Sequence, residues 1–189
     1  MEIKIKKAKL TRDGRVEATY VDVDGNEISM KGNNPCHQDL KDAIARLVPF
    51  FADLTEQKEA PLINWYDVEG EQTTDALKML EVTGVTKGGD DNMPLIVMTG
   101  KRTLVTRRIL NLNAPGVEMN SETFDWEHID DFAEAVEAFF FEVHEYIVNR
   151  KWSVEQGTLD FEGTAEDPFS TAEAPADVVP IDEPAEHVA

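Results

Sequence analysis

The sequence predicts a single α+β domain over residues 1–161, followed by a disordered acidic tail over residues 162–189. The domain is expected to contain a mainly antiparallel sheet of about six strands, in the order βββ-α-βββ-α, with two helices packed on one face. Three observations predict this class: short alternating segments joined by Asp-Gly turns, a continuous apolar run in the middle of the chain, and two stretches with the periodicity of amphipathic helices.

The first three strands are expected over residues 2–10, 16–23 and 27–32. Asp13-Gly14 and Asp24-Gly25 separate these segments. An Asp-Gly pair between alternating runs is a strong signal for a hairpin, because glycine readily adopts the positive φ of tight turns. The three segments therefore predict an antiparallel meander.

A first helix is expected to begin at Asn34, because an Asn cap accepts a backbone N–H and Pro35 at the first helical position loses no needed donor. The apolar residues that follow at spacings of three and four, on one side of such a helix, are Leu40, Ile44, Leu47, Phe51 and Leu54. Pro49 lies within this pattern. Since proline removes an amide donor, it predicts either a kink or a break into two short helices.

The middle of the chain is expected to complete the sheet. Residues 56–78 show a weak pattern and are interpreted as a long connection, and a strand is expected over residues 77–86. The continuous apolar run at residues 95–98 is typical of a central strand that is buried on both faces. Gly100 is expected to turn the chain into a last strand over residues 103–112.

A second helix is predicted from Asp125, as its N-cap, to Arg150. Its apolar stripe consists of Ile129, Phe132, Val136, Phe139, Phe140, Val143 and Ile147. A stripe rich in Phe is most often part of a core, and the alternative is a groove for a partner. The other side of this helix is acidic and includes Asp131, Glu134 and Glu137.

Charge is the unusual property of the composition. The chain has 18 Lys and Arg against 38 Asp and Glu, a formal net charge of −20. Residues 118–189 contain 20 of the acidic and 2 of the basic side chains, whereas residues 1–117 are nearly neutral. From about residue 163 the chain is also poor in large apolar residues, and such a composition predicts a disordered acidic tail.

Two small basic clusters lie in the nearly neutral part of the chain. The first is at Lys4, Lys6, Lys7 and Lys9, and the second is at Lys101, Arg102, Arg107 and Arg108. Lysines on strands commonly protect sheet edges against aggregation, which is the simpler interpretation. The alternative for both clusters is contact with a polyanion, and for the second cluster we expect this to be a weak contact with nucleic acid.

No catalytic pattern is evident. Cys36 and His37 are adjacent, and adjacent residues on a helix point about 100° apart, so they do not form a nucleophile and base pair readily. The histidines lack metal-ligand spacing, and turn chemistry explains Asp90-Asp91 better than a metal site. We therefore expect no enzyme activity, no metal and no cofactor. The absence of a signal peptide, and of the roughly 18 apolar residues that span a bilayer, predicts a cytoplasmic protein without a membrane partner.

One short peptide fits a known pattern. Residues 156–161, Gln-Gly-Thr-Leu-Asp-Phe, have the form Q-x-x-L-x-F. This peptide resembles the one by which bacterial DNA polymerases and repair proteins dock on the sliding clamp. The resemblance covers six residues and implies that Gln156 makes polar contacts at the pocket rim, while Leu159 and Phe161 fill an apolar cleft. The alternative is a last edge strand or a segment packed against the domain.

These features support three hypotheses. The first is a non-enzymatic accessory protein of bacterial or phage DNA metabolism that recruits a protein partner, such as the sliding clamp, through its C-terminal segment. The second is an inhibitor whose acidic helix mimics nucleic acid and binds a DNA-binding enzyme, as anti-restriction proteins do. The third, ranked last, is a metal-dependent enzyme that uses the Asp90-Asp91 loop. The oligomeric state is left open.

Overall fold

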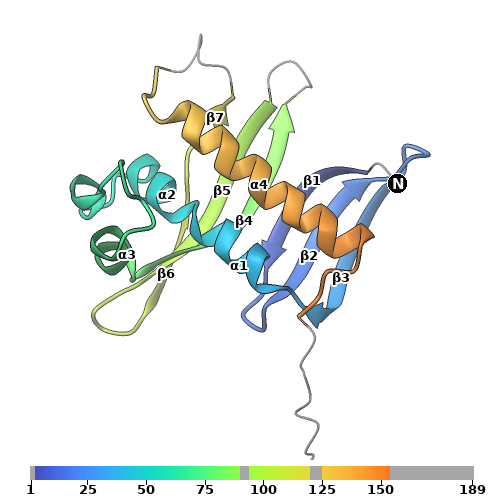
Figure 1. The fold of residues 1–189 in the computed structure, drawn as a ribbon, viewed down its shortest axis with the longest axis horizontal. Coiled ribbons are helices and arrows are strands. Elements are labelled where there is room, and N and C mark those ends of the chain that lie inside the picture. Colours follow the sequence, from blue (N-terminus) through green and yellow to red (C-terminus); the bar gives the residue numbers. More distant parts are fainter. Residues whose placement is uncertain (1–2, 90–93, 120–124, 154–189) are drawn as a thin grey trace, which may run out of the picture. The chain divides into compact units, whose positions relative to one another are not determined.

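An antiparallel sheet of seven strands forms the base of the fold (Figure 1). The structure is a computed structural model that describes residues 3–89, 94–119 and 125–153. The strands are β1 (Lys4–Leu10), β2 (Arg15–Val21), β3 (Glu27–Pro35), β4 (Leu80–Gly89), β5 (Pro94–Thr103), β6 (Ile109–Asn113) and β7 (Val117–Glu118). Their order in the sheet is β3-β2-β1-β4-β5-β6, and β7 pairs with β5. The predicted α+β class and antiparallel sheet are confirmed.

The N-terminal meander forms through the two expected turns. Gly14 and Gly25 have φ angles of 70° and 84°, in the left-handed region that favours glycine. The Asp22 carboxylate accepts hydrogen bonds from the backbone N–H groups of Asp24 and Asn26, which holds the second turn closed. The Asp-Gly pairs therefore indicated both hairpins correctly.

The helices are α1 (Gln38–Ala45), α2 (Val48–Leu54), the 3-10 turn η1 (Ala60–Leu62), α3 (Glu71–Leu77) and α4 (Ile129–Val148). The break predicted at Pro49 is present, because this proline lies in the first turn of α2, where its missing N–H costs no hydrogen bond. The predicted helix start at Asn34 is wrong. Strand β3 continues through Pro35, and the side chain of His37 caps α1 instead.

Three other element predictions need correction. Gly100 lies inside β5, opposite Val82 of β4, and does not turn the chain. The turn comes instead between Thr103 and Ile109, which form the first pair of the β5–β6 hairpin. Helix α3 lies in the stretch interpreted as a connection. Helix α4 begins after His128, so Asp125 lies outside the helix and is not its cap.

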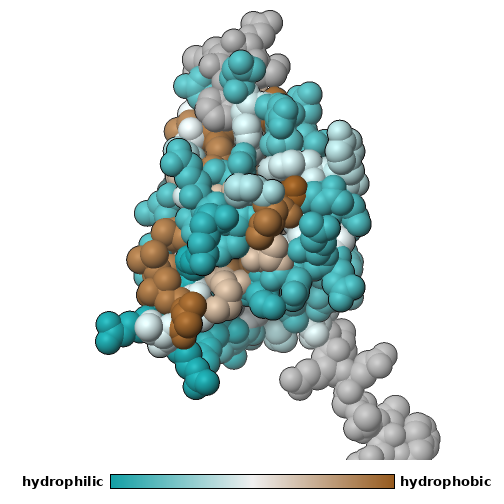
Figure 2. Space-filling model, turned by 90° about the vertical axis from the view of Figure 1, so that its left-hand side faces the viewer, coloured by the Kyte–Doolittle hydropathy of each residue, from teal (hydrophilic) through white to brown (hydrophobic). Residues whose placement is uncertain are grey.

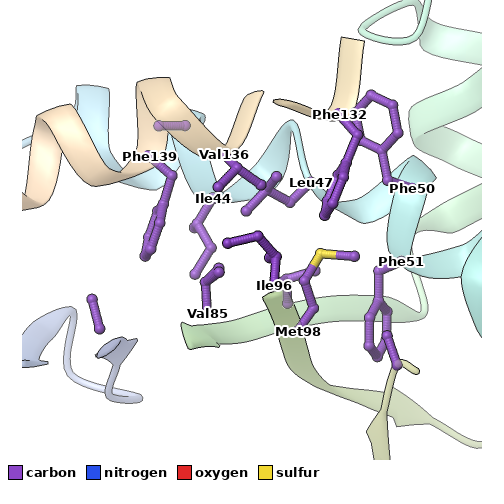
Figure 3. Packing of buried hydrophobic residues seen from close by; sticks show 14 of the residues in the cluster. Ile44, Leu47, Phe50, Phe51, Val85, Ile96, Met98, Phe132, Val136 and Phe139 are labelled. Carbon is purple, nitrogen blue, oxygen red and sulfur yellow. The ribbon is translucent and has the colours of Figure 1, made fainter. Parts of the chain in front are cut away.

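The core lies between the sheet and a layer of helices on one of its faces (Figure 1). Figure 3 shows side chains from α1, α2 and α4 meeting those of β4 and β5. The fully buried residues include Leu47, Phe51, Phe132, Phe139 and Val143. The Phe-rich stripe of the last helix is therefore core, as the simpler interpretation predicted.

The chain after α4 returns along β3. The backbone N–H of Ser153 donates to the carbonyl of Pro35, and the Tyr146 hydroxyl donates to the carbonyl of Asn34 at 2.6 Å. These bonds fix the end of α4 over the edge of the sheet. The described chain ends at Ser153, so the predicted boundary at residue 161 and the tail over residues 162–189 lie outside it.

Candidate binding face

An acidic surface forms where α4 crosses α1. Three exposed carboxylates of α4, those of Asp131, Glu134 and Glu137, lie on this surface, and α1 contributes Asp39 and Asp42. We call these five residues the acidic face. Residues three or four positions apart on a helix are surface neighbours, so the three carboxylates of α4 lie in a row. Within the described residues, none of these three has an ion-pair partner.

A groove of about 640 Å³ runs between α1 and α4. Asp39 and Asp42 line one side, and Glu134 and Glu137 line the other. Phe141 also lines this groove, although 59% of its surface is exposed. An exposed aromatic side chain can anchor a protein partner, because a phenyl ring removes a large apolar surface from water when it is buried.

The groove continues along α4 into a second hollow of about 330 Å³, because Arg46, Glu134 and Ala138 line both. Phe50 and Trp65 give the second hollow an aromatic lining. The combined surface therefore offers an apolar interior with a rim that is mostly acidic, and Arg46 within this rim is paired with Glu69.

Aromatic packing holds the N-terminal end of α4 in place. The Trp65 ring stacks on His128 with ring centroids 3.5 Å apart. The indole N–H of Trp126 donates to the Asp53 carboxylate at 2.9 Å, and the Trp126 ring packs edge-on against Phe132. These contacts join α4 to α2 and to the segment before α3. They hold in place the helix that carries the carboxylates.

Lys151 anchors the other end of the acidic face. Its ammonium donates to Glu142 at 2.8 Å and forms an ion pair with Asp39 of α1. The hydrogen bonds to Asp39 and Glu142 raise the pKa of Lys151 to about 12. The same lysine lowers the pKa of Asp39 below its ordinary value, so this carboxylate is ionised at neutral pH.

The four basic residues predicted to contact nucleic acid do not form one surface. Arg102 is only 14% exposed and donates to both carboxylate oxygens of Glu59, at 2.6 and 2.7 Å, and to Gln57. These bonds raise the pKa of Arg102 and lower that of Glu59. Lys101 pairs with Glu81 across the sheet. Arg107 and Arg108 lie in the turn of the β5–β6 hairpin.

The residues considered for catalysis are not arranged for it. Cys36 is fully buried, and burial raises the pKa of its thiol, which keeps it protonated. His37 accepts a hydrogen bond from the backbone N–H of Asp39 as the cap of α1. No group of three His, Cys, Asp or Glu side chains that could hold a metal occurs in residues 3–89, 94–119 and 125–153.

Several sequence predictions fall on residues outside the described part. These are the docking peptide residues Gln156, Leu159 and Phe161, and the Asp90-Asp91 loop. In the part of the chain that is described, no helix has both the length and the apolar character needed to cross a bilayer.

The sequence indicated three of the five carboxylates of the acidic face. Asp131, Glu134 and Glu137 were expected on the outer side of the last helix, and they are exposed there. Phe141 and Trp65 were missed. Phe141 does have a signal in the sequence, because it lies beside the apolar stripe of the helix rather than within it.

Comparisons of the chain with models of protein families, with curated proteins and with solved structures find no match.

Proposed function

We propose that the protein is a non-enzymatic interaction protein that binds the basic, nucleic-acid-binding surface of a partner through its acidic face. The observation that carries the proposal is the row formed by Asp131, Glu134 and Glu137, which have no ion-pair partner among the described residues, beside the exposed ring of Phe141. Charges of one sign on a rigid support attract a partner of opposite charge and speed its association.

The spacing of these carboxylates suits a surface that normally binds DNA. Three residues of an α-helix rise about 4.5 Å, so Asp131, Glu134 and Glu137 follow one another at intervals of about this length along the axis of α4. One strand of B-DNA presents one charge per about 3.4 Å of its axis. The DNA-binding groove of a partner contains Lys and Arg residues that neutralise phosphates. These residues would find a similar number of negative charges per unit length on this part of α4.

Phe141 and the aromatic lining of the groove add apolar surface, which a nucleic-acid backbone lacks. Burial of an exposed aromatic side chain stabilises an interface by the removal of apolar surface from water. A partner that combines basic residues with an apolar side chain would bind the acidic face more tightly than a purely basic one. This combination gives the site specificity for a protein.

A second way to recruit a partner is the Q-x-x-L-x-F peptide at residues 156–161. The compact unit of the chain spans Met1–Val154, so the peptide begins two residues after this unit ends. We propose that Gln156, Leu159 and Phe161 dock on the sliding clamp of a bacterial or phage replication system. The two proposals use different residues, so a single experiment separates them.

The experiment is capture of partners from bacterial lysate with four forms of the full chain as bait. The first is the intact protein. The second carries Asp131→Lys, Glu134→Lys and Glu137→Lys, and the third carries the same change in charge at the exposed residues Asp24, Glu56 and Asp75. The fourth carries Leu159→Ala and Phe161→Ala. Mass spectrometry identifies what each bait retains.

The acidic-face proposal predicts a DNA-binding protein that is captured by the intact chain, by the third form and by the fourth, and is lost with the second. Equal loss with the second and third forms would contradict it, because the effect would then follow net charge alone. Capture of the sliding clamp that is lost only with the fourth form would instead support the peptide.

A further inference from the structure

The two edges of the sheet differ in how they are protected. Strand β3 forms one edge, where Glu27, Lys31 and Pro35 stand on the strand and its pairing with β2 is interrupted by a register shift. Charges, proline and bulges are the usual means by which edge strands avoid pairing with other chains. Strand β6 forms the other edge. Its sequence, Ile-Leu-Asn-Leu-Asn, contains no charged residue and no proline, and its pairing with β5 has no bulge.

The backbone groups of β6 that do not bond to β5 can be assigned from the pairing of the two strands. The N–H of Thr103 donates to Met79, away from β6, while the N–H of Ala114 donates to Met98 of β5. Bonded and non-bonded pairs alternate along an antiparallel ladder. Leu110 and Leu112 therefore bond to β5, and the backbone N–H and C=O groups of Ile109, Asn111 and Asn113 point outward from the sheet.

Apolar side chains accompany these outward groups. Val105 is 93% exposed, Ile109 62% and Leu110 45%, all within the β5–β6 hairpin and its last strand. In Figure 2, hydrophobic surface gathers on the lower part of the molecule, at the height of this hairpin in Figure 1. An exposed edge with apolar side chains is a template for strand addition.

We propose that β6 is the interface of a homodimer, in which two copies pair β6 with β6 in antiparallel orientation about a two-fold axis at Asn111. In this register Asn111 lies opposite its counterpart, Ile109 lies opposite Asn113, and Leu110 lies opposite Leu112. Each outward N–H then donates to an outward C=O of the other copy. The sheet continues from one copy into the next.

We assign the partner strand to a second copy of this chain because the sequence of β6 is complementary to itself in this register. The leucines of the two copies meet on one face of the joined sheet, where paired apolar side chains stabilise strand association. The antiparallel orientation also places Arg107 and Arg108 of the two copies at opposite ends of the interface. Parallel pairing would bring these four arginines together, and like charges oppose association.

The dimer would leave the acidic face open. Because the two-fold axis is perpendicular to the sheet, the helices of both copies lie on the same side, and the two acidic faces point in the same direction. A strand of five residues buries less than a standard interface, so the dimer is expected to form in the micromolar range or above (about 1 μM or more).

Sedimentation velocity of the full chain over concentrations of about 1–500 μM tests the proposal. The intact protein is expected to shift from monomer to dimer as its concentration rises. Asn111→Lys, which opposes two like charges at the axis, and Asn111→Pro, which removes an outward N–H, are each expected to stay monomeric throughout. Ser29→Lys places the same charge on the β3 edge and is expected to dimerise like the intact protein.

A charge pair then checks the register. Asn111→Asp alone is expected to be monomeric, and an equimolar mixture with Asn111→Lys is expected to form a heterodimer, because opposite charges then face each other at the axis. Circular dichroism of each variant confirms that it is folded. An intact protein that stays monomeric, a dimer that survives Asn111→Lys, or a mixture that fails to associate would each overturn the proposal.

Discussion

Replacement of Phe139 by Ala is expected to lower the free energy of unfolding by about 3–5 kcal/mol. Phe139 is fully buried, and its ring lies among the side chains that α4 directs toward the sheet (Figure 3). Truncation to Ala removes apolar contacts and leaves a cavity that the neighbouring helices fill only in part. Urea denaturation followed by circular dichroism measures the change.

Phe141 provides the matched control, because it lies two residues away on the same helix and is 59% exposed. Phe141→Ala is expected to change the free energy of unfolding by less than about 0.5 kcal/mol, as surface substitutions usually do. It is also expected to weaken capture of the partner, whereas stability stays the same. Equal destabilisation by the two substitutions would contradict the orientation of α4.

Gly100→Ala is expected to destabilise the protein by about 3 kcal/mol, at the upper end of the usual cost of overpacking. A Cβ at this position would lie 2.5 Å from the backbone oxygen of Glu81 and 2.7 Å from the ring of Phe51. Neither the paired strand nor the buried ring can move away easily. The midpoint of urea denaturation should therefore fall sharply.

Gly88 of β4 is the control for this substitution. A Cβ there meets only the backbone oxygen of Leu95, at 3.9 Å, and Gly88 has no positive φ. Gly88→Ala is therefore expected to leave stability nearly unchanged. If Gly100→Ala were tolerated as well as Gly88→Ala, then α2 would not pack on β5 as described.

Gly100 also shows why part of the fold could not be predicted from the sequence. Glycine marks a turn in many sequences, and it also occurs where another backbone or ring approaches closely. The second reason applies here, and it depends on Phe51, which is 49 positions away in the chain. Local pattern alone contains no information about that contact.

The local sequence pattern was sufficient to predict the elements that are determined by residues close together in the chain. The Asp-Gly turns, the proline break between α1 and α2 and the Phe-rich stripe of α4 all act within a few residues, and the sequence predicted each of them. Helix α3 was missed because only Thr73 and Leu77 of its seven residues are buried, which is too few to give a periodic signal.

The difference between local and distant contacts also decides which features of the acidic face could be predicted from the sequence. Asp131, Glu134 and Glu137 share a helix, so their spacing alone placed them on one side. Their proximity to Asp39 depends on how α4 crosses α1. Arg102 is not available to a partner because it pairs with Glu59, which is 43 residues away in the chain. Such contacts between distant parts of the chain required the structure.

The central claim is that the acidic face occupies the surface with which a partner binds nucleic acid. Competition tests it most directly. The captured partner is bound to a fluorescently labelled DNA duplex, and the anisotropy of the label is followed as the protein is added. We predict that the intact chain releases the DNA and that the form with Asp131→Lys, Glu134→Lys and Glu137→Lys does not. A ternary complex, in which the DNA stays bound while the protein also binds, would contradict the account.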